Sequence, residues 1–83
     1  MEPIRVYGAD WCESTRRTLS HLDGLGIQHD YINVDRDGDA SAWVKRHNDG
    51  KERKPTLDIG GCILTSPSNE QLDEVLRTQR LLA

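Results

Sequence analysis

The chain has 83 residues, of which 35% are hydrophobic and 30% charged, and its formal net charge at pH 7 is −3. A chain this short buries only about 60 to 65% of the surface that its unfolded form exposes, which argues against a deep internal ligand cavity. The acidic balance gives no broad basic surface for nucleic acid, and no apolar run approaches the roughly 18 residues of a membrane span. We therefore expect residues 1–83 to form a single soluble domain that binds neither nucleic acid nor membrane.

Cysteine usage favours a reducing compartment. Cys12 and Cys62 are the two cysteines of the chain, and no charged-then-apolar signal segment opens the sequence. A secreted domain held together by disulfides is therefore not expected, and the predicted location is the cytoplasm. The three histidines lack the spacing of metal ligands, so no metal site is predicted.

The first half of the chain alternates β-type and helical patterns. Residues 4–7 (IRVY) predict a strand, which the following GAD ends. A helix is predicted from Cys12 to about Gly24, because Thr15, Leu19 and Leu22 recur at helical spacing. Residues 27–34 predict a second strand. The aspartates of residues 35–40 can cap a second helix, on which the pattern places Ala40, Trp43, Val44 and His47.

The second half predicts a hairpin and a last helix. A polar loop, residues 48–54, leads to Pro55, and residues 56–65 form two short runs joined by Gly60-Gly61, a hairpin signal. Ser68 with Gln71 three residues later is a capping-box pattern that starts the last helix. The order βαβαββα predicts an α/β fold with parallel first and second strands, a four-stranded mixed sheet and helices on both faces. This is the minimal thioredoxin fold.

Cys12 is the candidate nucleophile. It stands where a strand gives way to a helix, and the free N–H groups and positive dipole end of a helix N-terminus stabilise a thiolate. Arg16, one turn on, adds positive potential, whereas Asp10 and Glu13 oppose it, so we expect a weakly lowered pKa for Cys12. The alternative is that Cys12 is only a small buried side chain.

Several segments of the chain together resemble the glutaredoxin family. They are, in order between Ile4 and Leu76, VYGADWC, GIQHDYINVD, KPT, IGG and SPSNEQL. The likeness is in particular to the small bacterial glutaredoxin-like group that includes the mycoredoxins. It implies a thiol–disulfide oxidoreductase of cell redox homeostasis in which Cys12 attacks a mixed disulfide between a protein and a low-molecular-weight thiol. Glutathione, mycothiol and bacillithiol are the candidate thiols, and a flavin disulfide reductase is the implied indirect partner.

The resemblance also implies a thiol-binding site. Pro55 would be the cis proline beside the active site, and the backbone of Lys54 would pair with the peptide-like part of the thiol. Ser68 and Asn69 would offer N–H groups to its carboxylate, which accords with the anion preference of helix N-termini. From the residues alone, Pro55 is equally a proline at the entry to a strand, and Ser68 is a helix cap.

The chain departs from the family pattern at Thr15 and at Lys54. Dithiol members carry a second cysteine where Thr15 stands, so an intramolecular disulfide cannot form there. Cys62 does not replace it, because a four-residue strand of about 13 Å separates it from Pro55, and bridgeable cysteines need Cα atoms within about 7 Å. A monothiol mechanism is therefore predicted. The Thr15 hydroxyl either donates to the Cys12 thiolate or bonds its own helix backbone, and relatives usually carry an apolar residue at the position of Lys54.

Three other functions compete with this prediction. A redox-inactive thioredoxin-fold binding module would explain the missing second cysteine. An arsenate-reductase-like enzyme is suggested by CESTRRTL, with Arg16 binding the oxyanion. An iron–sulfur-carrying dimer is disfavoured, because Glu13 and Trp11 replace the glycine and the basic residue usual in such proteins.

Overall fold

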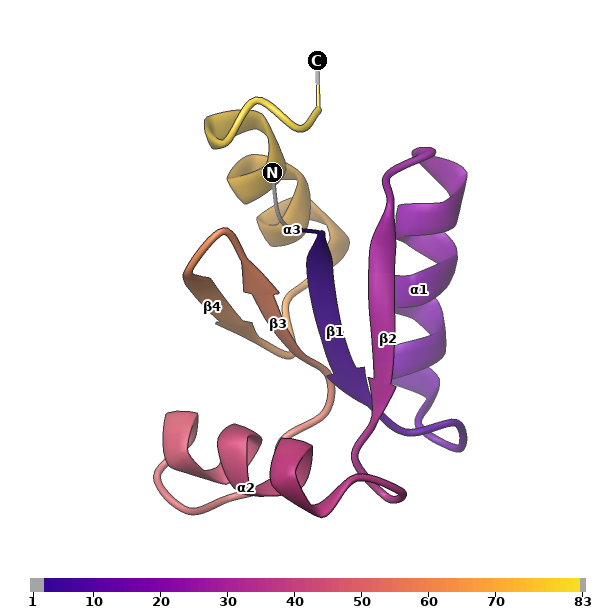
Figure 1. Ribbon diagram of the computed structural model, residues 1–83. Helices are drawn as coiled ribbons and strands as arrows, with labels where there is room; N and C mark the ends of the chain where they lie inside the picture. Colours follow the sequence, from indigo (N-terminus) through magenta and orange to yellow (C-terminus); the bar gives the residue numbers. More distant parts are fainter. Residues whose placement is uncertain (1–2, 83) are drawn as a thin grey trace.

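The computed structural model describes residues 3–82. The elements follow the predicted order (Figure 1): β1 (Ile4–Gly8), α1 (Glu13–Gly24), β2 (His29–Asn33), α2 (Gly38–His47), β3 (Thr56–Ile59), β4 (Cys62–Thr65) and α3 (Asn69–Thr78). The second strand is shorter than the predicted range 27–34. The N–H of Ile27 bonds back to the carbonyl of Leu22 at 3.1 Å and so closes the turn after α1, and β2 begins two residues later.

The four strands form one mixed sheet in the order β2-β1-β3-β4. β1 and β2 are parallel, with Val6 opposite Tyr31, whereas β3 runs antiparallel to both β1 and β4. The turn between β3 and β4 is Gly60-Gly61, and both glycines have positive φ, 57° and 90°. Such angles favour glycine in a two-residue hairpin turn, so the predicted hairpin is confirmed.

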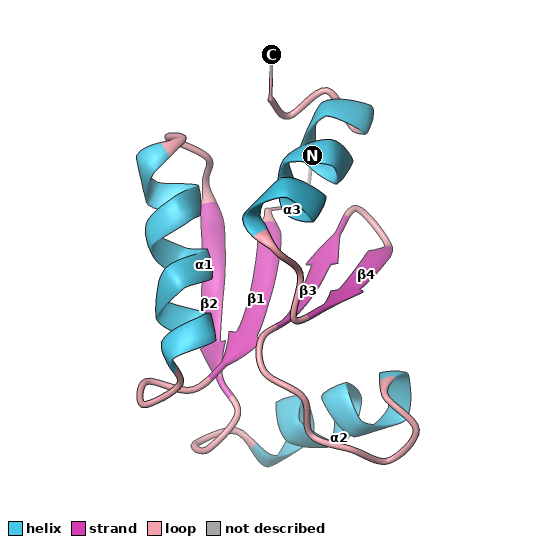
Figure 2. Cartoon of the chain, turned by 180° about the vertical axis from the view of Figure 1, so that it is seen from behind, coloured by secondary structure: helices cyan, strands magenta, loops and turns pink. Residues whose placement is uncertain are grey.

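The helices cover the two faces of the sheet unequally. Figure 2 shows α1 and α3 on one face, whereas α2 crosses the end of the sheet where β1 and β2 finish. The larger core lies under α1 and α3 and comprises Ile4, Val6, Leu22, Leu57, Ile59, Leu72 and Leu76. A smaller core lies under α2 and comprises Tyr7, Val34, Ala40 and Val44. Alternate residues of β1 supply both cores, which is the period-two pattern of a strand buried on both faces.

The starts of the helices differ in how they are capped. The Asp37 side chain accepts the N–H of Ala40 at the start of α2, and Ser68 and Gln71 form the predicted capping box at the start of α3. Each cap satisfies N–H groups that a helix leaves unpaired and is worth about 1 kcal/mol. The N-cap of α1 is Cys12, whose side chain makes no capping bond. The first turn of α1 therefore keeps donors available at the cysteine.

Candidate functional site

The site is built where the start of α1 meets the chain that enters β3. Cys12 is half buried, with extended backbone angles, φ −81° and ψ 117°. Its Sγ lies 4.0 Å from the carbonyl oxygen of Lys54, 42 residues away in sequence. The Lys54–Pro55 peptide bond is cis, and Pro55 is buried. The fold thus brings together three residues that the sequence analysis selected, Cys12, Lys54 and Pro55.

Neighbouring donors control the protonation of Cys12. Burial raises the pKa of its thiol, but the hydroxyl of Thr15 and the backbone N–H groups of Thr15 and Ser14 lower it, as does the positive charge of Lys54. The net result is a pKa below the ordinary value, as expected from the sequence. Since the thiolate is the nucleophilic form of cysteine, this environment increases the fraction of Cys12 that can attack a disulfide.

Thr15 is fixed between the helix and the first strand. Its side chain is fully buried, and its Oγ1 accepts the N–H of Ala9 at 3.4 Å. It packs on Gly8 so closely that a Cβ at that position would lie 2.5 Å from Oγ1 and from Cγ2 of Thr15. Because the oxygen of Thr15 accepts from Ala9, its own hydrogen can point to the sulfur of Cys12. The Thr15 side chain therefore packs against β1 and also stabilises the Cys12 thiolate.

Arg16 lies one turn into α1 and binds the loop before Cys12. Its Nη1 donates to the carbonyl oxygen of Asp10 at 2.9 Å, and its side chain is exposed. Arg16 thus fastens the loop that precedes α1. A contribution of Arg16 to the Cys12 thiolate stays a prediction. An oxyanion site of the arsenate-reductase type would need this guanidinium directed at the cysteine, and the structure directs it to the loop.

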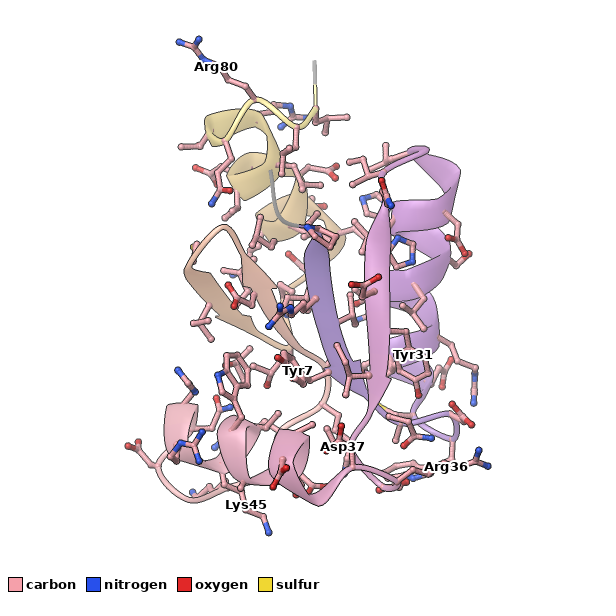
Figure 3. All side chains as sticks on the ribbon, in the orientation of Figure 1. Tyr7, Tyr31, Arg36, Asp37, Lys45 and Arg80 are labelled. Atoms are coloured by element: carbon pink, nitrogen blue, oxygen red, sulfur yellow. The ribbon has the colours of Figure 1, made fainter. Side chains whose placement is uncertain are left out.

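The loop that carries Cys12 is also tied to β2. The Tyr31 hydroxyl donates to Oδ1 of Asp10 at 2.7 Å, and Figure 3 shows Tyr31 on β2 near this loop. Burial, the hydrogen bond to Asp10 and the nearby negative charges together raise the pKa of Tyr31 to about 12. The tyrosine therefore stays neutral and keeps donating across the working pH range. Tyr31 thus binds the side chain of Asp10, and Arg16 binds its backbone carbonyl.

Lys54 lies in a set of contacts that the sequence analysis did not identify. Its Nζ is 2.8 Å from Oε1 of Glu52 and 4.9 Å from the centre of the Trp11 ring. Ser41 donates a hydrogen bond to the other carboxylate oxygen of Glu52. The Trp11 ring in turn donates to Asp35 at 2.8 Å. Apart from the Lys54–Glu52 pair within one loop, these contacts join different segments of the chain, and no spacing in the sequence signals them.

The start of α3 is connected to the same carbonyl that faces Cys12. Ser66 Oγ donates to the carbonyl oxygen of Lys54 at 3.2 Å, on the turn that leads to Ser68. The N–H of Ser68 donates to Gln71 at 2.9 Å, so the capping box occupies the donor that the family resemblance assigned to a carboxylate. The next N–H groups, those of Asn69 and Glu70, have no partner within the helix because they belong to its first turn.

Asn69 also faces a second surface. Its Oδ1 is buried and has no hydrogen-bond partner within residues 3–82. The residue borders a hollow of about 360 Å³ between α1 and α3, together with Arg17, Ser20, His21, Gly24 and Leu25. Asn69 thus lies at this hollow as well as at the start of α3, where its backbone N–H is a candidate donor to a ligand.

Cys62 lies apart from this site. It is the first residue of β4 and pairs with Ile59 across the hairpin, whereas the opposite end of β3 adjoins Pro55. Cys12 and Cys62 are both free thiols. This arrangement agrees with the argument that Cys62 cannot act as the resolving partner of Cys12.

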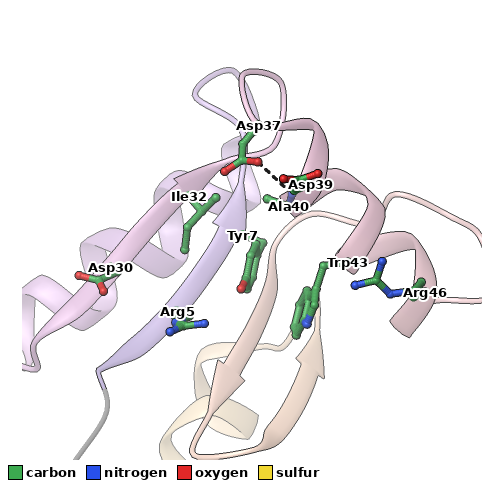
Figure 4. Close-up of a pocket in the computed structure, with 9 residues that line it drawn as sticks. All are labelled: Arg5, Tyr7, Asp30, Ile32, Asp37, Asp39, Ala40, Trp43 and Arg46. Carbon is green, nitrogen blue, oxygen red and sulfur yellow. Dashed lines mark hydrogen bonds between the residues drawn. The ribbon is translucent and has the colours of Figure 1, made fainter.

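A larger hollow, of about 480 Å³, lies on the α2 face of the sheet (Figure 4). Its floor is the Tyr7 ring, stacked on Trp43 with ring centres 4.3 Å apart. Charged side chains of both signs surround this pair. None of the predicted site residues borders it; the lining residues are Arg5, Tyr7, Asp30, Ile32, Asp37, Asp39, Ala40, Trp43 and Arg46. The size of this hollow is therefore not a guide to the position of the candidate reactive cysteine.

Residues 3–82 contain neither a metal centre nor a membrane-spanning helix. Across residues 3–82, no cluster of three or more His, Cys, Asp or Glu side chains is arranged to hold a metal ion. Within the same range, no helix has the length and apolar character needed to cross a membrane.

Comparisons with known proteins identify the family and the fold of the chain. The Glutaredoxin family matches residues 4–63. Mycoredoxin 1 of Corynebacterium glutamicum is 42% identical over 68 residues, which cover 81% of this chain and 84% of the relative. A thioredoxin-like crystal structure superposes with a TM-score of 0.82 at 22% identity, covering 93% of this chain and 97% of the other. A buckwheat glutaredoxin–glutathione complex gives 0.69 at 27% identity, covering 95% and 72%. The chain has the thioredoxin fold, belongs to the glutaredoxin family and is a thiol–disulfide oxidoreductase.

Proposed function

We propose that this protein reduces mixed disulfides between proteins and a low-molecular-weight thiol, with Cys12 as its single catalytic cysteine. The observation that carries the proposal is the surroundings of Cys12. Its thiol faces the Lys54–Pro55 segment, its pKa is lowered, and the position one turn on is Thr15 instead of a second cysteine. Such a site supports attack on a disulfide but supplies no internal thiol to resolve the product.

The first step transfers the small thiol to the enzyme. The Cys12 thiolate attacks the small-thiol sulfur of the mixed disulfide, a Cys12–small-thiol disulfide forms, and the protein sulfur leaves as a thiolate that takes a proton from water. The hydroxyl of Thr15 and the N–H groups of Ser14 and Thr15 stabilise Cys12 before attack. The leaving protein is thereby reduced in one exchange.

The second step regenerates the enzyme. A second molecule of the small thiol, as its thiolate, attacks the small-thiol sulfur bound to Cys12 and releases the symmetrical small-thiol disulfide. The Cys12 thiolate leaves, and the environment that lowers its pKa also makes it a good leaving group. A flavin disulfide reductase then returns the small disulfide to its thiol, outside this protein. A reducing compartment such as the cytoplasm suits this cycle.

The thiol site proposed for this chain lies between Lys54 and the start of α3. The backbone of Lys54 would pair with the amide part of the thiol, next to Pro55. The free N–H groups of Asn69 and Glu70, at the positive end of α3, would bind an acceptor oxygen of the thiol, while Ser68 caps the helix. The similarity to a glutaredoxin that was crystallised with glutathione supports this placement.

The test is turnover of a defined mixed disulfide. A cysteine peptide is blocked in separate arms with glutathione, mycothiol or bacillithiol, and each arm is supplied with the same free thiol and its reductase. We expect release of free peptide in at least one arm, with double-displacement kinetics. Failure of all three arms, with Cys12 shown to be reduced at the start, would contradict the proposal. The arm that turns over identifies the thiol.

A further inference from the structure

Lys54 is held in place to an unusual degree for a lysine. Its side chain is only 14% exposed, although lysine side chains normally extend into water. Its ammonium lies between the Glu52 carboxylate, at 2.8 Å, and the Trp11 ring, at 4.9 Å from the centre. Two favourable contacts, an ion pair and a cation–π contact, thus act on the same ammonium group.

Both partners of Lys54 are themselves anchored. Glu52 accepts a hydrogen bond from Ser41 of α2, and Trp11 donates one to Asp35 in the loop after β2. The hydrogen bonds from Lys54 and then Ser41 lower the pKa of Glu52, so its carboxylate is ionised throughout the neutral range. We call these five residues, Trp11, Asp35, Ser41, Glu52 and Lys54, the clasp.

The clasp is adjacent to the reactive sulfur. Trp11 precedes Cys12 in the chain, and the carbonyl of Lys54 is the group that the sulfur contacts. The positive charge of Lys54 lowers the pKa of Cys12. The ammonium that Glu52 binds is therefore one whose charge acts on the reactive thiol.

Glu52 has two opposite roles open to it, and the geometry decides between them. It either neutralises Lys54 and draws the ammonium away from Cys12, or it prevents the ammonium from escaping into water. A lysine without partners keeps its rotamer freedom, and an exposed charge is strongly screened. The ammonium also lies over the ring of Trp11, the residue before Cys12, so the position in which Glu52 holds it is on the segment that carries the reactive sulfur.

We infer that Glu52 is a positioning residue for thiol exchange: with Trp11 it keeps the Lys54 ammonium at the mouth of the Cys12 site, where that charge favours the thiolate and the approach of anionic thiols and disulfides. The inference rests on the proposed function for the assignment of Cys12 as the nucleophile. It adds a substrate preference, since a negatively charged small thiol gains from the held cation and a neutral one does not.

The experiment compares two alkylating reagents of different charge. In a Cys62→Ser background, where Cys12 is the one remaining cysteine, its rate of modification is followed against pH with neutral iodoacetamide and with anionic iodoacetate. Lys54→Met should move the iodoacetamide profile to higher pH and lower the iodoacetate-to-iodoacetamide ratio severalfold, because the held cation attracts the anionic reagent and not the neutral one. Glu52→Gln should also move the profile to higher pH and lower the ratio, but by a smaller amount. The variant that carries both Glu52→Gln and Lys54→Met should match Lys54→Met alone.

Control variants separate the held cation from other effects. Lys51→Met removes an exposed lysine of the same loop and should change neither quantity. Lys54→Arg keeps the charge and should retain the ratio, and circular dichroism of each variant checks its fold. The inference is overturned if Lys54→Met leaves the ratio unchanged, if Glu52→Gln raises it or leaves it unchanged, or if Lys51→Met lowers it equally. Alkylation needs no small-thiol turnover, so failure here is distinct from failure of the proposed function.

Discussion

The two cysteines of this chain have similar exposure and very different surroundings. Cys12 and Cys62 are both half-buried free thiols. Cys12 caps α1, next to the donors of Ser14 and Thr15 and the charge of Lys54. Cys62 begins an edge strand, where its neighbour across the hairpin is Ile59. Partial burial alone therefore does not make a thiol reactive. A helix N-terminus makes a cysteine reactive because its aligned N–H donors stabilise the thiolate.

Removing each sulfur in turn tests this difference between the two cysteines, with the largest expected change in activity. Cys12→Ser should reduce mixed-disulfide turnover to the uncatalysed background, because a serine hydroxyl is not ionised at neutral pH. Cys62→Ser, its matched control, should keep turnover near that of the unaltered protein. Coupled turnover with the small thiol and its reductase measures both. Equal loss in the two variants would contradict the assignment of the site.

The close packing beneath Cys12 gives the largest expected effect on stability. A methyl group at Gly8 would lie 2.5 Å from Thr15, so Gly8→Ala should lower the free energy of unfolding by about 1–3 kcal/mol. It should also displace Thr15 and slow turnover. The control is Gly38→Ala, where the added atom meets nothing within 4 Å. Urea denaturation of both compares them, and an equal loss in the two would show that the contact at Gly8 is unimportant.

The hydroxyl of Thr15 is one of the donors that distinguish Cys12 from Cys62. Thr15→Val keeps the shape but removes the donor to Cys12, so the pKa of Cys12 should rise and turnover at pH 7 should fall several-fold. It also leaves the N–H of Ala9 without its acceptor, at a cost of about 1–3 kcal/mol. Thr15→Ser retains the hydroxyl and should keep the pKa low. The pH dependence of Cys12 alkylation distinguishes the variants; an unchanged profile for valine would refute the role of the hydroxyl.

The smallest expected effect concerns the contact between Tyr31 and the loop of Cys12. The pKa of Tyr31 is raised to about 12, whereas an unfolded tyrosine ionises near pH 10. Below pH 10 both states are neutral and the stabilisation is complete; it is then lost as the pH rises from about 10 to about 12. The free energy of unfolding should therefore fall more steeply between pH 10 and 11 than in Tyr31→Phe. Parallel curves would mean that the Asp10 contact is absent in solution.

The fold was predictable because its signals are local. The capping box of Ser68 and Gln71, the cap at Asp37 and the Gly60-Gly61 turn each act within a few residues, and each is found where it was predicted. The boundary of β2 was less predictable. Ile27 has a strand-forming side chain, but its N–H is bonded to the carbonyl of Leu22 in the turn after α1, and the pairing with β1 starts only at His29.

The site was predictable only in part, because its remaining contacts join distant segments. Cys12 has a local signal at the end of a strand, whereas its meeting with the Lys54 carbonyl depends on packing across 42 residues. Glu52, Ser41 and Asp35 carry ordinary polar side chains in loops and a helix start, and no spacing relates them to Cys12. Arg16 shows the converse. Helical spacing places it near the cysteine, but the Asp10 carbonyl binds its guanidinium.

One measurement tests most directly the claim that Cys12 works alone by exchange with a small thiol. The reduced protein is mixed with one equivalent of a peptide–small-thiol mixed disulfide, without free thiol, and its intact mass is recorded. The account predicts that the protein gains the mass of one small thiol, located at Cys12, while free peptide appears in equal amount. A protein that carries the peptide at Cys12, or one that releases peptide and shows only a loss of two hydrogens, would contradict it.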